Sequence, residues 1–406
     1  MEQVVVTGMG VISTAGHNLS DFWTTLESGT ITYGVIREFA EDLNYRIKIG
    51  SRIEDQSWQR HLDESISRQY GRAAQYAMSA SLDALEHAGL NREEIREART
   101  AICIGTTMGE IQAEEQLSEW RHRTGGELLP DHLLRQYSTN RISYAVKRAI
   151  GAHGPIFTIP AACAAGNYSL AIAKRFIEWG QADIAIAGGV DIFSRVAFVG
   201  FQRLLSLADN LCRPFDHKRK GLVVGEGCGI VILERLSHAK ARGAKIWGEI
   251  AGVGLTSDRY HMTAPHPEGD GAVRAMELAI QEAGLSVHEI DYISAHGTGT
   301  VANDKTEVKA MSRVFGEESI PPFSSIKSML GHSLGAAASL ELIACLQMLD
   351  KGVMLPTVNF SAAQFDCSID CVPNTPRKSN IQQIISNSFA FGGQVSSIVV
   401  RGEEGL

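Results

Sequence analysis

The chain alternates short apolar runs with longer amphipathic segments, and this alternation predicts an α/β protein. Residues 155–159 (PIFTI) predict a buried strand. The segment at 164–179 carries apolar residues at helical spacing and ends at Gly180, which predicts a helix. Strands that alternate with helices favour sheets with helices on both faces.

The pattern of elements occurs twice. Residues 77–95 (AMSASLDALEHAGLNREEI) and 275–290 (AMELAIQEAGLSVHEI) each predict an amphipathic helix that ends at Ala-Gly-Leu, with glycine as the C-cap. A strand and a glycine-threonine turn follow each helix, at 101–107 and 292–298. The repetition indicates an internal duplication.

Each half continues with a proline, a short strand, a turn of small residues and a long helix, at 155–180 and 322–352. We expect two halves, residues 1–243 and 244–406, divided at a polar stretch near 241–245. We expect them to share one core, with equivalent turns from both halves near a common centre.

Composition excludes several classes of protein. The 406 residues are 44% hydrophobic and 21% charged, which is ordinary for a soluble globular protein. The net charge of −8, with no basic tail or stripe, argues against a general nucleic-acid binder. No apolar run reaches the roughly 18 residues of a membrane span, and no basic leader precedes the strand at Val4. We expect an untargeted cytoplasmic protein without a membrane association.

The cysteines favour a reduced setting, since they are odd in number and scattered, several of them inside apolar runs. Cys367 and Cys371 form the only close pair, and no second pair or nearby histidine completes a zinc site there. The seven cysteines are Cys103, Cys163, Cys212, Cys228, Cys345, Cys367 and Cys371.

Two glycine motifs resemble nucleotide-binding loops only in part. Thr7-Gly-Met-Gly-Val-Ile-Ser13 lacks the third glycine of a dinucleotide fingerprint and the acidic residue at the proper distance. Gly225-Glu-Gly-Cys-Gly229 lacks the lysine and hydroxyl residue of a phosphate loop. We interpret both as tight strand exits, and expect no nucleotide.

Cys163 occupies the junction between the predicted strand and helix of the first half, in Pro160-Ala-Ala-Cys163-Ala-Ala-Gly166. Unpaired N–H groups and the positive end of the helix dipole favour thiolate at such a place. Small neighbours leave room for a substrate carbonyl. The alternative is one more buried, inert cysteine.

Two histidines follow strands in the second half. His296 lies in Ser294-Ala-His-Gly-Thr-Gly-Thr300, and His332 follows Ser325-Ile-Lys-Ser-Met-Leu-Gly331. Flanking glycines let backbone and ligand approach closely, which a structural histidine does not require. A zinc site made of Cys163 and both histidines is an alternative, but a fourth ligand is lacking. A third glycine-rich segment, at 387–393 (NSFAFGG), lies near the C-terminus.

These segments, in this order, resemble the condensing enzymes with the thiolase-type fold, specifically the β-ketoacyl-acyl-carrier-protein synthase II type. Arg213-Pro-Phe-Asp216 and residues 257–263 (SDRYHMT) extend the resemblance, which runs from Val4 to Val400. It implies a layered αβαβα architecture. Thiolases use a second cysteine in the C-terminal glycine loop, and initiating synthases pair cysteine and histidine with asparagine. This chain resembles the elongating Cys-His-His class.

The resemblance implies that Cys163 accepts an acyl group from a pantetheine thioester, with the backbone N–H groups of Cys163 and Phe391 as the oxyanion hole. His296 and His332 would stabilise the enolate left when a malonyl thioester loses CO2. The enolate carbon would then extend the chain by two carbons. The resemblance implies no metal, redox or other bound cofactor, since the substrates travel on the phosphopantetheine arm of acyl carrier protein.

The resemblance also assigns supporting roles. Lys327 would hold an electrostatic network with Glu307 and His296. The remaining assignments are Thr263, Thr298 and Thr300 for the pantetheine arm, and Met108, Phe201, Phe389 and Phe391 for the acyl pocket and its gate.

The sequence departs from the family's pattern at several places. Ala390 replaces a gate glycine and Gln394-Val395 replaces Thr-Asn, so gate motion is expected to differ. Glu110 stands where an apolar residue is usual. Residues 61–68 (HLDESISR) replace a basic carrier-facing helix. The candidate carrier contacts that remain are Arg121, Arg123, Arg203 and Arg213.

These departures leave the pathway open between fatty-acid synthesis and a specialised type II polyketide or polyene synthase. The expected assembly is a homodimer, or a heterodimer with a chain-length-factor-like subunit. A non-catalytic carrier-binding scaffold is a third hypothesis, which the intact cysteine and histidines disfavour.

Overall fold

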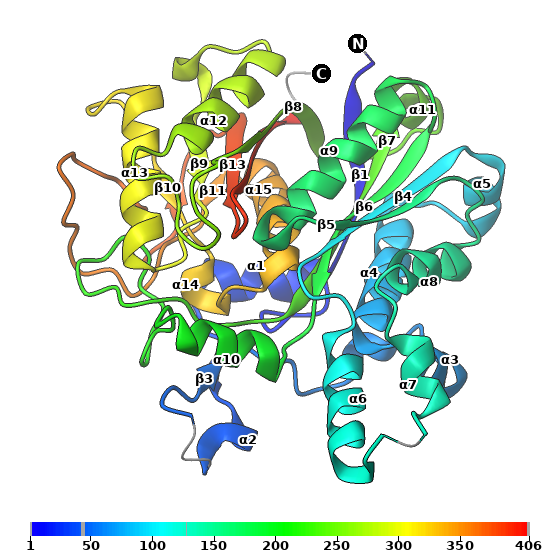
Figure 1. Cartoon of the computed structure of the whole chain (residues 1–406). Helices are drawn as coiled ribbons and strands as arrows, with labels where there is room; N and C mark the ends of the chain where they lie inside the picture. The colour runs from blue at the N-terminus through cyan, green and yellow to red at the C-terminus, as the bar shows by residue number, and fades with distance from the viewer. Residues whose placement is uncertain (1, 42–44, 127, 404–406) are drawn as a thin grey trace.

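Ten strands form one mixed sheet whose two ends repeat the same strand order (Figure 1). The computed structural model describes residues 2–41, 45–126 and 128–403. One half of the sheet runs β1 (Val4–Ser13), β7 (Gly227–Arg235), β6 (Ile184–Asp191), β4 (Thr100–Thr106), β5 (Ile156–Pro160). The other runs β8 (Gly248–Ser257), β14 (Gln394–Arg401), β13 (Gln383–Phe389), β9 (Tyr292–Ser294), β10 (Phe323–Ser324).

The five strands of each half, numbered in chain order, follow the same order from the centre of the sheet outward: first, fifth, fourth, second, third. The two halves meet where β1 pairs with β8. The predicted duplicated α/β architecture is therefore confirmed.

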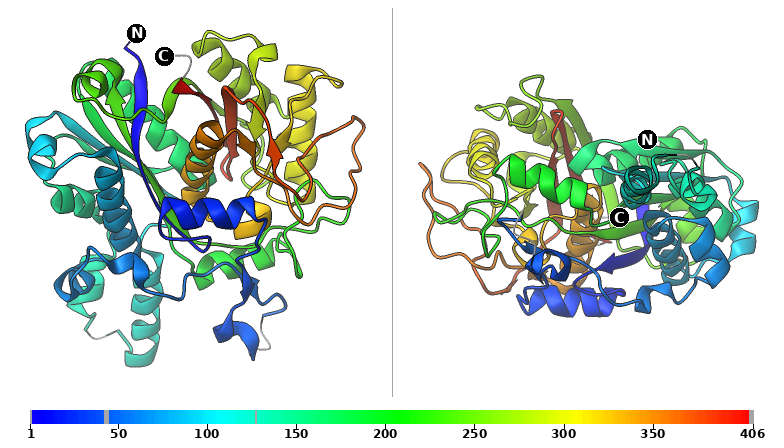
Figure 2. Two further views of the ribbon diagram at one scale, coloured as in Figure 1. Left: turned by 180° about the vertical axis from the view of Figure 1, so that it is seen from behind. Right: turned by 60° about the horizontal axis from the view of Figure 1, so that its bottom comes forward.

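Helices complete the layers of the fold (Figure 2). Between the two halves of the sheet lie α9 (Ala165–Glu178) and α15 (Ala337–Lys351), which contact each other and strands of both halves. The outer face of the first half is covered by α4 (Arg72–Ala88) and α8 (Arg141–Ile150), and that of the second by α12 (Asp270–Glu282) and α13 (Val301–Phe315). The largest apolar cluster surrounds the two central helices.

The remaining elements are short or lie at the periphery. They are α1 (Leu19–Glu27), β2 (Gly34–Val35), α2 (Arg37–Ala40), β3 (Ile49–Gly50), α3 (Glu64–Gln69), α5 (Arg92–Glu97), α6 (Ile111–Thr124), α7 (Asp131–Gln136), α10 (Arg195–Arg203), α11 (Leu236–Ala241), α14 (Lys327–Leu330), β11 (Val353–Met354) and β12 (Arg377–Lys378), with 3₁₀ turns η1 (Ser57–Gln59), η2 (Ala162–Ala164), η3 (Val287–Glu289) and η4 (Leu334–Ala336).

The glycines of the Thr7–Ser13 motif lie inside a strand, so the predicted strand exit is wrong. β1 continues through both of them. A Cβ at Gly8 would lie 2.3 Å from the carbonyl oxygen of Ala84, and one at Gly10 would lie 2.0 Å from that of Ala80. Glycine is needed here because the backbone of α4 packs directly on the strand.

The strand predicted as buried at 155–159 is an edge strand. β5 pairs only with β4 among the described strands, and Phe157 is 43% exposed. The Phe157 ring stacks on Phe176 of α9 at a centroid distance of 5.3 Å. Apolar character alone does not separate a central strand from an edge strand whose apolar side chains face a neighbouring layer or a partner.

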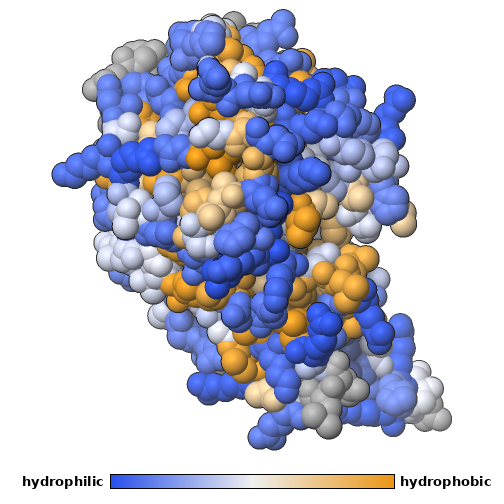
Figure 3. All heavy atoms as spheres, turned by 90° about the vertical axis from the view of Figure 1, so that its left-hand side faces the viewer, coloured by the Kyte–Doolittle hydropathy of each residue, from blue (hydrophilic) through white to orange (hydrophobic). Residues whose placement is uncertain are grey.

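Polar residues cover much of the face seen in Figure 3, interrupted by apolar patches. None of the helices in the described ranges is long and apolar enough to cross a membrane.

Candidate active site

One cavity, at the junction of the two halves, gathers most of the residues that the sequence singled out. Both central turns contribute to it, η2 through Cys163 and the turn before η4 through His332, while His296 comes from the end of β9. The predicted residues that line the cavity are Cys163, Phe201, Thr263, His296, Thr298, Thr300, His332, Phe389 and Phe391.

The two central turns share an unusual backbone conformation. Ala162, just before Cys163, has φ 45°, and Leu334, at the equivalent place after His332, has φ 52°. Left-handed conformations are unfavourable for residues with a side chain, so the surrounding structure must hold both turns. Ser388 contributes to this by donating a hydrogen bond to the Cys163 carbonyl oxygen at 3.0 Å.

The Cys163 thiol is less acidic than its position at a helix start predicted. Burial raises its pKa to about 12, although Lys327 and the backbone N–H groups of Cys163 and Phe391 act in the opposite direction. The prediction of a favoured thiolate is therefore wrong, because the loss of hydration outweighs the helix end. The same two N–H groups lie next to the sulfur, where a substrate carbonyl oxygen would approach.

This pKa predicts how Cys163 reacts with a simple electrophile. Since only the thiolate is nucleophilic, alkylation by iodoacetamide should accelerate roughly tenfold per pH unit from pH 7 to 9. Peptide mapping by mass spectrometry measures the rate at Cys163 itself, and the Cys163→Ala variant identifies adducts on the other cysteines. A rate that levels off below pH 9 would contradict the raised pKa.

Backbone hydrogen bonds fix both histidines. The N–H of His332 donates to the Val223 carbonyl at 2.7 Å, and its carbonyl accepts from Gly225 N–H at 2.8 Å. The N–H of His296 donates to Glu307 Oε1 at 2.7 Å. The two imidazole rings stand nearly perpendicular, at 84°, with centroids 5.4 Å apart. Both residues line the same cavity.

Both imidazoles are held neutral. Burial lowers the pKa of His296 and of His332 well below 6.5, and the ammonium of Lys327 lowers each further. A neutral imidazole has one N–H that can donate and one nitrogen that can accept a proton. The pair can thus donate hydrogen bonds to a developing oxyanion without carrying a charge of its own.

The direct carboxylate partner of Lys327 is Glu341 of α15, while its charge also acts through space on Glu307 and His296, the predicted members of its network. All four side chains are buried. Glu307 accepts the N–H groups of His296 and Gly297, and burial raises its pKa to about 8. Glu307 thus fixes the backbone that carries His296, and the positive charge of Lys327 lowers the pKa of both histidines.

The gate loop joins β13 to β14. Phe391 is 37% exposed, and its ring lies 5.6 Å from that of Phe201. The N–H of Gly392 donates to the Met262 carbonyl at 2.8 Å, which ties the gate to the loop after β8. Ala390 is outside the left-handed region, unlike Gly392 and Gly393 with φ 85° and 79°, so alanine causes no backbone strain here.

Met108 is the predicted pocket residue that the structure places elsewhere. It does not line the cavity, and its side chain packs against the apolar cluster under α4 and α8. Its N–H donates to Asp191 at 2.8 Å. Glu110, two residues on, accepts the N–H groups of Ala73 and Ala74 and so caps α4, which explains a buried carboxylate at this position.

Sequence reasoning missed Asp191 and Glu341. Asp191 is fully buried and accepts hydrogen bonds from Thr106, Thr107, Met108 and Gly335, which joins the loop after β4 to the turn after His332. A signal existed for each: an acid two residues after a glycine pair, at the end of β6, and a lone acid in the apolar run of α15. Charged residues at such places are buried only with partners.

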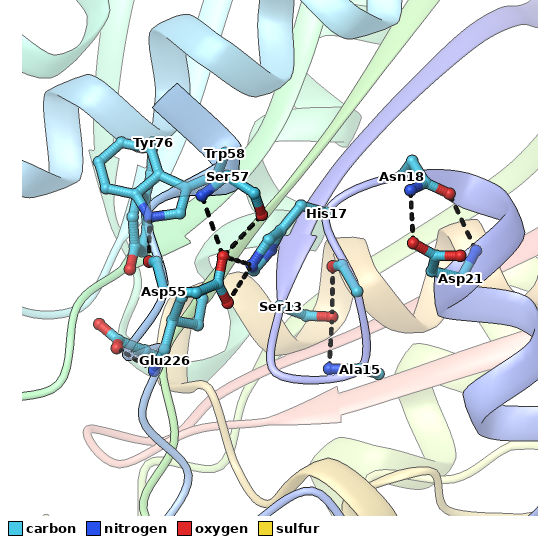
Figure 4. Close-up of polar contacts among 12 residues, drawn as sticks. Ser13, Ala15, His17, Asn18, Asp21, Asp55, Ser57, Trp58, Tyr76 and Glu226 are labelled. Carbon is cyan, nitrogen blue, oxygen red and sulfur yellow. Dashed lines mark hydrogen bonds and ion pairs between the residues drawn. The ribbon is translucent and has the colours of Figure 1, made fainter. Parts of the chain in front are cut away.

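Figure 4 shows a second group of polar contacts, made by residues that include Asp55, Ser57, His17 and Glu226. Glu226 accepts the N–H of Ile53 at 2.7 Å and of Phe193 at 3.0 Å. Asp55 accepts the Ser57 hydroxyl at 2.6 Å and lies 3.0 Å from His17 Nε2. Glu226 directly follows Gly225, whose N–H donates to the His332 carbonyl, so the hydrogen bonds of Glu226 help to hold the backbone beside His332.

One group of side chains in the described ranges has the spacing of a metal site. It consists of His61, Asp83 and Glu86. Arg60 already occupies the Asp83 oxygen that faces His61, so a cation would compete with the guanidinium.

Comparison with known proteins identifies the class. Residues 1–239 match the family profile "Beta-ketoacyl synthase, N-terminal domain" and residues 247–361 match "Beta-ketoacyl synthase, C-terminal domain". The chain belongs to the β-ketoacyl synthase family.

Relatives of this chain cover nearly its whole length. It is 34% identical to Nodulation protein E of Rhizobium meliloti, over 96% of this chain and 97% of that protein. It is also 34% identical to 3-oxoacyl-acyl-carrier-protein synthase 2 of Vibrio harveyi, over 98% of each.

Solved structures agree with this assignment. The structure described as "The ishigamide ketosynthase/chain length factor" superposes with a TM-score of 0.95 at 37% identity, covering 99% of both chains. A type II PKS acyl-carrier protein in complex with its ketosynthase superposes with a TM-score of 0.91 at 30% identity, also covering 99% of both.

Proposed function

We propose that this chain is an elongating ketosynthase, which joins an acyl group held on Cys163 to a malonyl unit on acyl carrier protein. The main observation that supports this proposal is that Cys163, His296 and His332 line one cavity, with the N–H groups of Cys163 and Phe391 next to the Cys163 sulfur. The product is a 3-oxoacyl-acyl-carrier protein two carbons longer than the starting acyl group.

In the first half-reaction the Cys163 sulfur attacks the thioester carbonyl of an acyl-pantetheine. The carbonyl oxygen accepts hydrogen bonds from the two backbone N–H groups while the charge develops. The thiol proton moves through a neutral imidazole to the departing pantetheine sulfur. The acyl group now forms a thioester with Cys163, and the carrier leaves as a free thiol.

In the second half-reaction a malonyl thioester occupies the cavity. Its carboxylate leaves as CO2, and the electron pair of the broken bond forms an enolate whose oxygen accepts hydrogen bonds from His296 and His332. The enolate carbon attacks the acyl carbonyl on Cys163, and the cysteine sulfur leaves and recovers a proton. Side chains and backbone N–H groups supply all the chemistry, so the proposal includes no bound cofactor.

Thr298, Thr300 and Thr263 suit the polar part of the pantetheine arm. All three line the cavity, and the hydroxyls of Thr298 and Thr300 lie 2.9 Å apart. Phe201, Phe389 and Phe391 form its aromatic side and suit the acyl chain. We place the reaction in the cytoplasm, since all seven cysteines are free.

Incubation with octanoyl- and malonyl-loaded carrier protein tests the proposal. We expect 3-oxodecanoyl-carrier protein and one CO2 per product, detected by mass spectrometry and by label from malonate. Product without CO2 release would mean another reaction, and no product from either carrier-bound or pantetheine-bound substrates would remove the proposed activity.

A more specialised role is a second candidate. The structural likeness to a ketosynthase with a chain length factor, at 37% identity, favours a polyketide or polyene pathway in which the chain pairs with such a subunit. Purification from the source organism with identification of bound subunits separates this role from a homodimeric synthase.

The exposed edge of β5 predicts how the subunits associate. We expect β5 to pair with the equivalent strand of a second ketosynthase-fold subunit, which would cover Phe157. Phe157→Lys should shift the assembly to the 44.0 kDa monomer in light scattering. Val35→Lys, at an exposed site on β2, is the matched control. A Phe157→Lys variant that keeps the mass of the unaltered assembly would contradict this contact.

A further inference from the structure

The mouth of the cavity carries large apolar side chains that face solvent. Leu205 is 74% exposed and Met262 is 78% exposed, while Leu204 and Val301 are about half exposed. Met262 lines the cavity, Leu205 precedes the lining residue Ser206, and Val301 lies between the lining residues Thr300 and Ala302. Leu204 precedes Leu205, in the segment between Phe201 and Ser206, which both line the cavity. We call these four residues the apolar rim.

Leu205 occupies a position that favours glycine. Leu205 lies just after the C-terminal end of α10 and has φ 54°. Its N–H donates to the Gln202 carbonyl, and the N–H of Ser206 donates to the Phe201 carbonyl. This is a helix C-terminal motif whose left-handed residue is usually glycine. A leucine here strains the backbone and gains little burial in return. Neither local structure nor core packing accounts for it.

Cations without partners accompany the apolar rim. Arg203 precedes Leu204, Arg259 lies near Met262 on the loop after β8, and Lys305 lies one helical turn after Val301. Their side chains form no ion pair within the described ranges, whereas nearby Lys220 is paired with Asp209. Of the other predicted carrier contacts, Arg213 donates to the Asn359 carbonyl and Arg123 pairs with Glu119.

We propose that the apolar rim is the docking surface for the carrier protein, which binds mainly through an apolar helix face and only secondarily through its acidic residues. This inference rests on the proposed function, because a substrate tethered to a carrier must enter through this mouth. The three unpaired cations complement an acidic protein, and the four apolar residues require a partner that removes them from water. A small free thioester bound in the cavity would leave Leu204 and Leu205, which do not line it, exposed to water.

The substitution Leu205→Gly separates docking from folding. Glycine relieves the left-handed strain, so the thermal midpoint of unfolding should stay the same or rise. Loss of the leucine should raise KM about tenfold for octanoyl-loaded acyl carrier protein of Vibrio harveyi, with kcat little changed. With octanoyl-pantetheine, which reaches Cys163 without a carrier, KM should stay within about twofold. Leu278→Ser, at an exposed site on α12, is the control.

Salt dependence tests the balance of forces. For docking that is mainly apolar, KM for the octanoyl carrier should change less than about threefold between 50 and 500 mM NaCl. A larger rise would overturn the apolar assignment. So would an unchanged carrier KM in Leu205→Gly, or an unaltered chain that uses the carrier no better than octanoyl-pantetheine. Failure with octanoyl-pantetheine itself would instead remove the proposed function.

Discussion

Cys163→Ala abolishes acylation of the protein and lowers condensation at least about 10⁴-fold. Cys163 is the cysteine that lines the cavity, and alanine offers no atom that can form a thioester. Intact mass after incubation with octanoyl carrier protein measures the loading. Because the substitution removes only a sulfur atom from a buried turn, the fold and the stability should change little.

The same variant should keep part of the second half-reaction. His296, His332 and Lys327 are untouched in Cys163→Ala, so malonyl carrier protein should still lose CO2 and yield acetyl carrier protein. Release of labelled CO2 provides this control. An octanoyl adduct of normal yield on Cys163→Ala would refute the assigned nucleophile.

His296→Ala and His332→Ala should have the opposite effect to Cys163→Ala: they impair CO2 release and condensation more than acyl loading. Each removes one donor to the enolate oxygen, so condensation should fall about 10²–10³-fold per substitution. Loading of Cys163 should persist in part, since the other imidazole and the N–H groups of Cys163 and Phe391 remain in place. Single-turnover measurement of octanoyl loading and of CO2 release resolves the two steps.

Glutamine variants serve as the controls for these histidines. An amide keeps an N–H donor, so His296→Gln and His332→Gln should retain more CO2 release than the alanine variants. Normal CO2 release by both alanine variants would contradict the enolate-binding role. Equal loss in alanine and glutamine variants, together with unfolding, would indicate a structural role instead.

The fold was predictable because its repeats are local patterns. Each half contains an amphipathic helix with a glycine cap and a strand with a glycine-threonine turn, and these positions do not depend on distant residues. The errors concern partners that are distant in sequence. Glycine is required at position 8 because α4 packs on β1 there. The edge position of β5 depends on the order of the strands in the sheet.

The site was predictable where chemistry and motif coincide, as at Cys163, His296 and His332. The electrostatics of the site could not be predicted from the sequence. The raised pKa of Cys163 results from its burial, which no local sequence pattern specifies. Lys327 and Glu341 are 14 positions apart and lie on two different helices, so no single local pattern marks their ion pair. Asp191 joins the loop after β4 to the turn after His332, and only the folded chain brings these two segments together.

Single-turnover trapping is the sharpest test of whether the acyl group passes through Cys163. The protein is loaded with octanoyl carrier protein, freed of excess carrier, mapped by peptide mass, and then mixed with labelled malonyl carrier protein. We expect one octanoyl group on the Cys163 peptide, which disappears at the same rate as 3-oxodecanoyl carrier protein and CO2 form. An octanoyl group on another residue, or product that forms while the Cys163 adduct persists, would contradict it.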